Sequence, residues 1–160
     1  MPNKYAYEEM KENMARAMGK HLDLSTKTAI EVANFLRGKT TAKAKAILAR
    51  VFEYKQAVPY KRFTNGLGHK PGKGIAAGRY PQKASKHFLA LIEQAEANAQ
   101  AKGLSSDLMI VHLAAQKGPT TWHYGRQQRR QAKRTHIEIV VQEIEKKEHR
   151  EPKKKTEEKQ

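Results

Sequence analysis

The chain has 160 residues, no cysteine, and 32 Lys or Arg against 16 Asp or Glu, which gives a formal net charge of +16. The lack of cysteine excludes disulfides, thiolate catalysis and Cys-based zinc sites and fits a reducing cytoplasm, and no apolar run is long enough to predict a membrane-spanning helix. The first eighteen residues carry three Glu and no apolar block, so they do not resemble a secretory signal.

The N-terminal third of the chain predicts a strand followed by two helices. Residues 14–24 alternate weakly between polar and apolar types and predict the strand. Apolar residues at helical spacing over 29–36 and 44–52 predict the two helices. Their expected caps and stop residue are, in chain order, Ser25, Thr26, Gly38, Thr40 and Thr41.

Residues 56–84 have no apolar periodicity. They contain five Gly and three Pro and predict a long irregular loop, which in a compact domain is usually functional or disordered. A third helix is expected to begin at Ser85 as its N-cap, to bury an apolar stripe over 88–99, and to end at Gly103.

The C-terminal part predicts two strands, over 108–116 and 135–143, with Ile137, Ile139 and Val141 on one face of the second. About eighteen polar and basic residues join them, whereas a hairpin loop rarely needs more than five. This linker therefore predicts an extension that projects from the sheet, by on the order of 25–30 Å if both arms are extended. Residues 144–160 carry charges of both signs and predict local helix followed by disorder.

The positive charge is concentrated in two windows that contain no Asp or Glu, Tyr54–Ile92 and Leu108–Ile137. They hold eight and six Lys or Arg residues, so they supply fourteen of the sixteen net positive charges. The rest of the chain is close to neutral. This distribution predicts a large polyanion that contacts the loop and the extension, rather than a lipid surface, which would need a basic amphipathic helix.

The chemistry of these two segments indicates nucleic acid. The extension places Trp122, His123 and Tyr124 before a series of arginines; arginine binds phosphate bidentately, and aromatic rings stack on unpaired bases. The glycine-rich loop contains Gly72-Lys73 but lacks the glycine spacing and the Ser or Thr of a P-loop. It predicts close approach of backbone amides to phosphates without hydrolysis. The seven histidines form no HxxxH or HExxH pair, so neither a metal site nor a cofactor is expected.

The chain resembles the large-subunit ribosomal protein L-twenty-two family over roughly residues 12–143. The resemblance is carried by four runs: RAMGKHLDLSTKTAIEVANFLRGK, AVPYKRFTNGLGHKPGKGIAAGRYPQKASKHFLALIEQAEANA, MIVHLAAQKGP and RTHIEIVVQE. The glycine-rich insertion at 57–81 resembles the archaeal and eukaryotic branch. Before Gly125-Arg126 this chain has only residues 120–124, where the family usually carries a longer basic stretch with proline, so its hairpin is expected to be shorter.

The resemblance implies an α+β domain over 1–143, in which three helices pack on a small three-stranded antiparallel sheet with a long protruding basic β-hairpin over 117–134. A charged tail would follow at 144–160. It implies a structural protein of the large ribosomal subunit, located in the cytoplasm and not an enzyme. Its expected partners are large-subunit rRNA, neighbouring ribosomal proteins and, at the hairpin tip, the nascent peptide in the exit tunnel, without membrane or small-molecule substrate.

The expected RNA-contacting residues are basic or aromatic, or histidine, and lie in the two windows or just before them. They are Arg37, Lys39, Lys61, Arg62, His69, Lys70, Lys73, Arg79, Tyr80, Lys83, Lys86, Lys117, Trp122, His123, Tyr124, Arg126, Arg129, Arg130, Lys133 and Arg134.

Two other functions compete with this interpretation. A free DNA- or RNA-binding regulator would more often present a recognition helix or a dimer interface, whereas here the basic residues cluster on loops. A nucleotide-dependent enzyme acting on RNA would need a converging acid, base or metal site, which the sequence does not indicate. Co-sedimentation with the large ribosomal subunit separates the structural protein from both.

Overall fold

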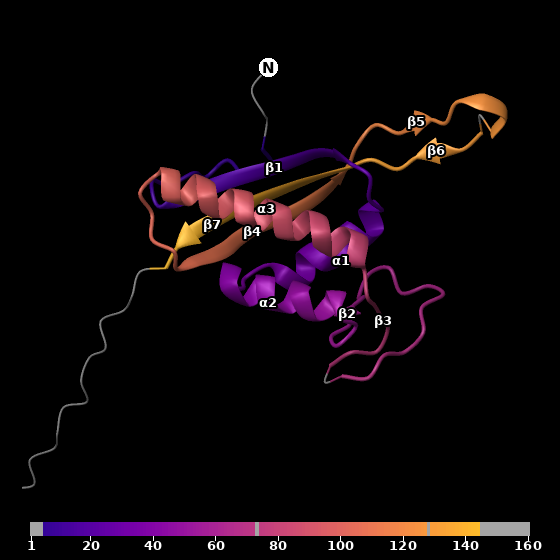
Figure 1. Cartoon of the computed structure of the whole chain (residues 1–160), viewed down its shortest axis with the longest axis horizontal. Coiled ribbons are helices and arrows are strands. Elements are labelled where there is room, and N and C mark those ends of the chain that lie inside the picture. The colour runs from indigo at the N-terminus through magenta and orange to yellow at the C-terminus, as the bar shows by residue number, and fades with distance from the viewer. Residues whose placement is uncertain (1–4, 73, 128, 145–160) are drawn as a thin grey trace, which may run out of the picture.

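The computed structural model describes residues 5–72, 74–127 and 129–144 (Figure 1). Its elements follow the predicted order, with short additional strands in the loop and in the extension. They are β1 (Met14–Leu22), α1 (Thr26–Leu36), α2 (Thr41–Phe52), β2 (Val58–Pro59), β3 (Gly78–Arg79), α3 (Gln82–Ala101), β4 (Leu108–Lys117), β5 (Thr121–Trp122), a 3-10 turn at Gly125–Gln127, β6 (Gln131–Ala132) and β7 (Thr135–Glu143).

The main sheet has three antiparallel strands in the order β1-β7-β4, so the last strand in sequence lies in the middle. Ile139 at its centre pairs with Ala17 on one side and with Leu113 on the other. Three helices with this sheet confirm the predicted α+β class. The predicted stripe of β7 is also confirmed, because Ile137, Ile139 and Val141 are fully buried.

The three helices cover one face of this sheet (Figure 1). α3 packs against β1, α1 packs against β4, and α2 lies mainly against α3. Their apolar stripes meet the inner face of the strands in one continuous core, as the helical spacing predicted. Its largest fully buried helical side chains are Leu36, Leu48, Phe88 and Ile92.

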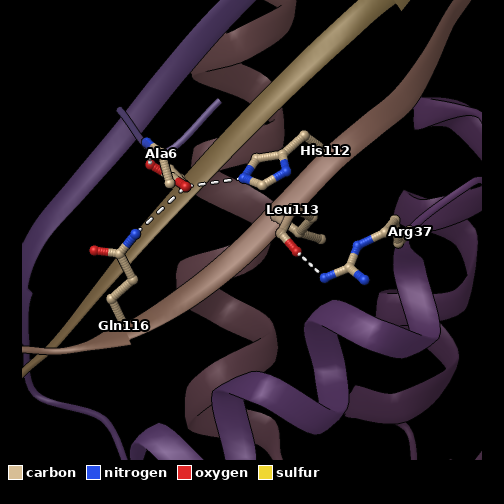
Figure 2. Close-up of polar contacts among 6 residues, drawn as sticks. Ala6, Arg37, His112, Leu113 and Gln116 are labelled. Atoms are coloured by element: carbon tan, nitrogen blue, oxygen red, sulfur yellow. Dashed lines mark hydrogen bonds and ion pairs between the residues drawn. The ribbon is translucent and has the colours of Figure 1, made fainter. Parts of the chain in front are cut away.

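The other face of the sheet is covered by the segment that precedes β1. Glu138 of β7 is 1% exposed there, and its carboxylate accepts hydrogen bonds from Ala6 N at 3.0 Å and, in the His112 tautomer that donates, from His112 Nε2 at 2.8 Å (Figure 2). The Tyr7 ring lies on His112, with ring centroids 5.3 Å apart. A buried carboxylate needs such partners, so Glu138 holds the N-terminal segment against the sheet.

The helix ends follow the predictions at most positions. Gly38 and Gly103 have φ of 75° and 77°, the left-handed conformation in which glycine ends a helix without strain. The Thr40 hydroxyl accepts a hydrogen bond from Lys43 N at 3.3 Å, which confirms it as an N-cap. Ser25 occupies the N-cap position of α1, but among the described residues its side chain makes no capping hydrogen bond.

The prediction that Ser85 caps α3 is wrong. The helix begins three residues earlier, at Gln82, with Pro81 in the N-cap position. The Ser85 amide already donates a regular helical hydrogen bond to Pro81 O at 2.9 Å, and its side chain is fully buried. Proline is favoured around the first turn because it has no amide hydrogen to satisfy there.

Both outer strands of the sheet have part of their free edge occupied. On β1, the carbonyl oxygens of Met14 and Arg16 accept hydrogen bonds from Lys102 Nζ at 2.7 Å and Asn98 Nδ2 at 2.9 Å of the α3 region. On β4, Ile110 exchanges backbone hydrogen bonds with the α1–α2 connection, and Arg37 Nη2 donates to Leu113 O at 2.7 Å (Figure 2).

The glycine-rich loop and the extension project from the same end of the helix-covered sheet (Figure 1). The loop is closed by the β2–β3 pair and ends at Pro81, three residues before its predicted end, because α3 starts early. The extension is a hairpin closed by the β5–β6 pair. Of the tail over 144–160, only Ile144 lies within the described residues, so the predicted helix and disorder fall outside them.

Throughout the described part of the chain, no helix combines the length and the apolar character needed to cross a bilayer.

Candidate nucleic-acid interface

The loop that carries the first basic window is fixed to α1 by Glu31. This side chain is 1% exposed, and its carboxylate accepts backbone hydrogen bonds from Lys61 N at 3.1 Å, Arg62 N at 2.8 Å and Phe63 N at 2.7 Å. The backbone therefore wraps around one buried anion, and the side chains of Lys61 and Arg62 remain exposed. This role is not among the sequence predictions, and the one local signal for it is that Glu31 is a lone acid within the apolar stripe of α1.

Further backbone hydrogen bonds give the glycine-rich loop a defined path. Tyr60 N donates to Ala77 O at 2.9 Å and Lys70 N donates to Ala76 O at 2.9 Å. Beside them, the Lys70 ammonium lies 5.7 Å from the centre of the Tyr80 ring, which also contacts the ring of Tyr54. The loop thus presents its cations from a hydrogen-bonded scaffold.

The second window is presented by the hairpin. Its backbone pairing runs outward from Gly118 N–Arg134 O at 2.8 Å, through β5 and β6, to His123 N–Arg130 O at 2.8 Å. Trp122 is 61% exposed and Tyr124 95% exposed. A shallow cleft of about 370 Å³ at the tip is lined by His123, Tyr124, Arg126 and Arg130.

The two windows meet at the start of α1. A cleft of about 490 Å³ there is lined by Tyr80 and Lys83 of the first window, by Lys133 of the second and by Asp23. Lys83 Nζ lies 2.5 Å from Asp23 Oδ2. This hydrogen bond, together with the positive charge of Lys83, lowers the pKa of Asp23. The ion pair leaves the surroundings of the cleft positive, because Lys133 and Arg134 lie close by.

Arg37 and Lys39 have partners within the fold. Arg37 uses one guanidinium N–H on Leu113 O, while the Lys39 ammonium donates to Phe35 O and lies over the Phe35 ring. Burial lowers the pKa of Lys39, and the charges of Lys43 and Lys61 lower it further. Lys39 and Lys61 both line a cleft of about 390 Å³ beside the loop.

The predicted residues fall into three groups by exposure. Lys39, Lys70, Tyr80 and Arg134 are half-buried, and Lys73 lies outside the described residues. The exposed ones are Arg37, Lys61, Arg62, His69, Arg79, Lys83, Lys86, Lys117, Trp122, His123, Tyr124, Arg126, Arg129, Arg130 and Lys133.

Four acidic residues lie at a distance from the two basic segments. Glu93 and Glu96 lie in the C-terminal half of α3, Asp107 precedes β4, and Glu143 ends β7, all away from the loop and the hairpin (Figure 1). Glu96 is paired with Lys45 of α2. Three acids do lie beside the basic segments, and each has a partner: Asp23 pairs with Lys83, Glu31 accepts from loop amides, and Glu53 pairs with Lys55.

Among the residues whose placement is described, no three His, Asp or Glu side chains come together as a group able to hold a metal ion. The arrangement offers cations, aromatic rings and backbone amides on projecting segments, which is the chemistry of phosphate and base contact.

Comparison with known proteins agrees with this geometry. The family described as ribosomal protein L22p/L17e matches residues 17–142, which is most of the chain. The chain belongs to this family. The match contains β4, most of β1 and of β7, the three helices, the glycine-rich loop and the hairpin.

Individual members of the L22p/L17e family are also similar to this chain in sequence. The large ribosomal subunit protein uL22 of Ignicoccus hospitalis is 42% identical over 148 residues, covering 86% of this chain and 93% of that protein. The uL22 proteins of Picrophilus torridus and Archaeoglobus fulgidus are 42% and 40% identical, covering 87% and 86% of this chain and 95% and 94% of their own lengths. These relatives are archaeal, which agrees with the branch predicted from residues 57–81.

Trp122 offers a direct test of the hairpin surface. As the single tryptophan, 61% exposed, it should emit as a solvent-exposed indole in the free protein. On binding a large-subunit rRNA fragment its emission should shift or be quenched, because an exposed ring stacks on unpaired bases. Trp122→Ala should cost about 1–3 kcal/mol of affinity, the usual contribution of one stacked base.

Two further measurements separate stacking from charge and from packing. Because Trp122→Ala removes no charge, the dependence of affinity on salt should stay that of the wild type. Trp122→Phe is the matched control and should keep most of the affinity. Blue-shifted emission that RNA leaves unmoved would show instead that the indole packs against protein.

Proposed function

We propose that this chain is a structural protein of the large ribosomal subunit, located in the cytoplasm, which binds large-subunit rRNA. One observation carries the proposal: the exposed cations of both acid-free windows lie on a projecting loop and a projecting hairpin at one end of the molecule, where Asp23, Glu31 and Glu53 each have a partner. Loops and hairpins of this kind suit irregular folded RNA, whereas a recognition helix suits a duplex groove. The uL22 relatives support the same conclusion.

The proposed contacts are the twenty basic, histidine and aromatic residues predicted from the sequence. Lys61, Arg62 and Arg79 would bind phosphates from the loop, and Arg126 and Arg130 from the hairpin. Arginine is suited to this role because its planar guanidinium binds phosphate with two parallel hydrogen bonds.

We also propose that the hairpin over 117–134 lines the nascent-peptide exit tunnel and touches the peptide near its tip. The support is the exposure of the tip. Tyr124 is 95% exposed there and is not part of the apolar core formed by the described residues. The role of the chain is binding and assembly with neighbouring ribosomal proteins, not catalysis. A photo-crosslinker in place of Tyr124 should attach to stalled nascent chains; attachment to rRNA alone would argue against the peptide contact.

Sedimentation of a cell lysate tests the ribosomal role. The tagged chain should co-migrate with the large subunit and remain there through a moderate salt wash, because many simultaneous phosphate contacts dissociate slowly. A free regulator or an RNA-modifying enzyme would leave the subunit under these conditions. Recovery of the chain mainly in the ribosome-free fraction would contradict the proposal.

The proposed organisation is a single body over 1–143 carrying the hairpin as an extension, with a charged tail at 144–160. Deleting residues 120–133 and closing the arms with a short turn should then leave a folded protein, because the β4–β7 pairing lies outside the deletion. Circular dichroism and thermal unfolding measure this. The variant should still enter large subunits through the loop surface; loss of cooperative unfolding would show that the hairpin belongs to the core.

A further inference from the structure

A separate cleft of about 320 Å³ lies between the start of α1 and the glycine-rich loop. Lys27 and Thr28 line it from α1, Tyr60, Arg62 and Phe63 from the segment after β2, and Arg79 from β3. None of the described residues that line this cleft is acidic. Three cations from three different segments therefore face one concave site.

The wall of this cleft is held in place by contacts already described and by aromatic packing. The Phe63 ring carries the Lys27 ammonium at 5.7 Å and the Arg62 guanidinium at 5.4 Å from its centre. The backbone amides of Arg62 and Phe63 are bound to the Glu31 carboxylate. Glu31, an acid behind this wall, thus directs its carboxylate oxygens to backbone amides.

Tyr60 supplies the observation that points to a ligand. The residue is 6% exposed, and its hydroxyl oxygen is buried without a hydrogen bond of normal geometry in the described part of the chain. Burial raises its pKa, whereas a poorly aligned hydrogen bond with the Thr28 side chain and the charge of Arg79 lower it. The phenol therefore stays protonated at neutral pH and remains a donor. A buried donor whose contact with Thr28 is poorly aligned is only partly satisfied, which is costly and usually indicates a further partner.

The start of α1 adds to the positive electrostatic potential in this cleft. The Ser25 side chain caps none of the first amides of α1, so the positive end of the helix dipole faces the cleft without a side-chain cap. Amides, hydroxyls and cations converge here without a competing carboxylate, which is the set of groups that binds a tetrahedral dianion or a phosphodiester.

We propose that this cleft binds one phosphate group of the RNA backbone, with the Tyr60 hydroxyl donating to a phosphate oxygen between Arg62, Arg79 and Lys27. This inference rests on the proposed RNA-binding function and assigns to it a specific pocket. RNA is favoured over free phosphate because the cleft opens next to the exposed cations of the first window, which would hold the neighbouring phosphates of the same strand. Tyr60, Lys27 and Thr28 are thereby added to the RNA-contacting residues.

The test is Tyr60→Phe in the full chain, because the proposal expects effects of opposite sign. Removing an unsatisfied buried hydroxyl should raise the Tm of the free protein by a few degrees. The same change should weaken affinity for a large-subunit rRNA fragment about tenfold, as expected for a hydrogen bond to a charged acceptor. The salt dependence of binding should stay unchanged, because no charge is removed.

Ser85→Ala is the matched control. The Ser85 hydroxyl is also buried without a hydrogen-bond partner in the described residues, but it lies inside α3 and lines none of the clefts discussed. Its removal should likewise raise the Tm, while affinity for RNA should equal that of the wild type. This pair of variants separates relief of a buried hydroxyl from loss of a phosphate contact.

Each result decides between alternatives. A lower Tm for Tyr60→Phe would show that the hydroxyl has a partner in the free protein, and unchanged RNA affinity would show that it does not contact phosphate; either overturns the proposal. If inorganic phosphate raises the Tm of the wild type but not of Tyr60→Phe, while RNA binds both equally, the cleft takes free phosphate and the RNA assignment is wrong. Failure of the wild type to bind rRNA would contradict the proposed function itself.

Discussion

Replacing Arg62, Lys70, Arg79 and Arg126 together with Gln should weaken binding to a large-subunit rRNA fragment by about a hundredfold at physiological salt. Each cation that contacts a phosphate releases roughly 0.7–0.9 counterions, so four lost contacts should reduce the slope of log affinity against log salt by about three. Filter binding or anisotropy over a series of potassium concentrations measures both quantities. The unfolding transition should change little, because these side chains lie outside the apolar core.

The matched control removes the same charge from other surfaces. Lys11, Lys20, Lys43 and Arg50 are exposed and lie outside both acid-free windows, so their joint replacement with Gln should change affinity only slightly. Equal losses in the two variants would mean that net charge alone governs binding. The position of the cations on the loop and the hairpin would then have no part in recognition.

Glu31→Ala should be the most destabilising single substitution on the loop side of the molecule. It leaves the backbone amides of Lys61, Arg62 and Phe63 without their shared acceptor at a position that is 1% exposed. Hydrogen bonds to a charged group contribute about 1.5–3 kcal/mol each but are not additive, so we expect a loss of about 3 kcal/mol. For a protein of this size that corresponds to a fall in Tm of about 10 °C, measured by thermal unfolding.

Two companion variants identify the cause. Glu31→Gln keeps one carbonyl acceptor and should show an intermediate loss. Glu53→Ala removes an exposed carboxylate that pairs with the neighbouring Lys55, and it should leave the unfolding transition where it is in the wild type. Affinity of Glu31→Ala for RNA should also fall, because the segment carrying Arg62 loses its attachment. A transition as stable as the wild type would show that the loop is held by its other backbone contacts.

The elements of this fold could be predicted because their patterns are local. The alternation of Ile137, Ile139 and Val141 and the cap at Thr40 depend only on near neighbours in sequence, and both predictions are confirmed. Ser85 was assigned wrongly because a serine before an apolar stripe is an equally good local cap. The competing feature was tertiary: its position faces the core, and Pro81 starts the helix earlier.

The contacts that organise the candidate interface could not be predicted from the sequence, because they join segments that are far apart along the chain. In the sequence, Glu31 and Glu138 are single acids among apolar residues. Their sequence neighbours do not indicate which backbone amides they bind. The approach of the two basic windows also depends on packing, since the Thr135 hydroxyl is bonded to Leu24 O at 3.0 Å and to the Thr26 hydroxyl at 2.9 Å. That buried threonine fixes the base of the hairpin beside the start of α1.

The hydrogen bonds at the edges of the main sheet should also reduce aggregation of the chain before it binds RNA. An exposed strand edge is a template to which another chain can add, and newly made proteins at high concentration are most at risk. Here Asn98 and Lys102 occupy carbonyls of β1, while Arg37 and the α1–α2 connection occupy β4. Repulsion between copies that each carry a net charge of +16 acts in the same direction.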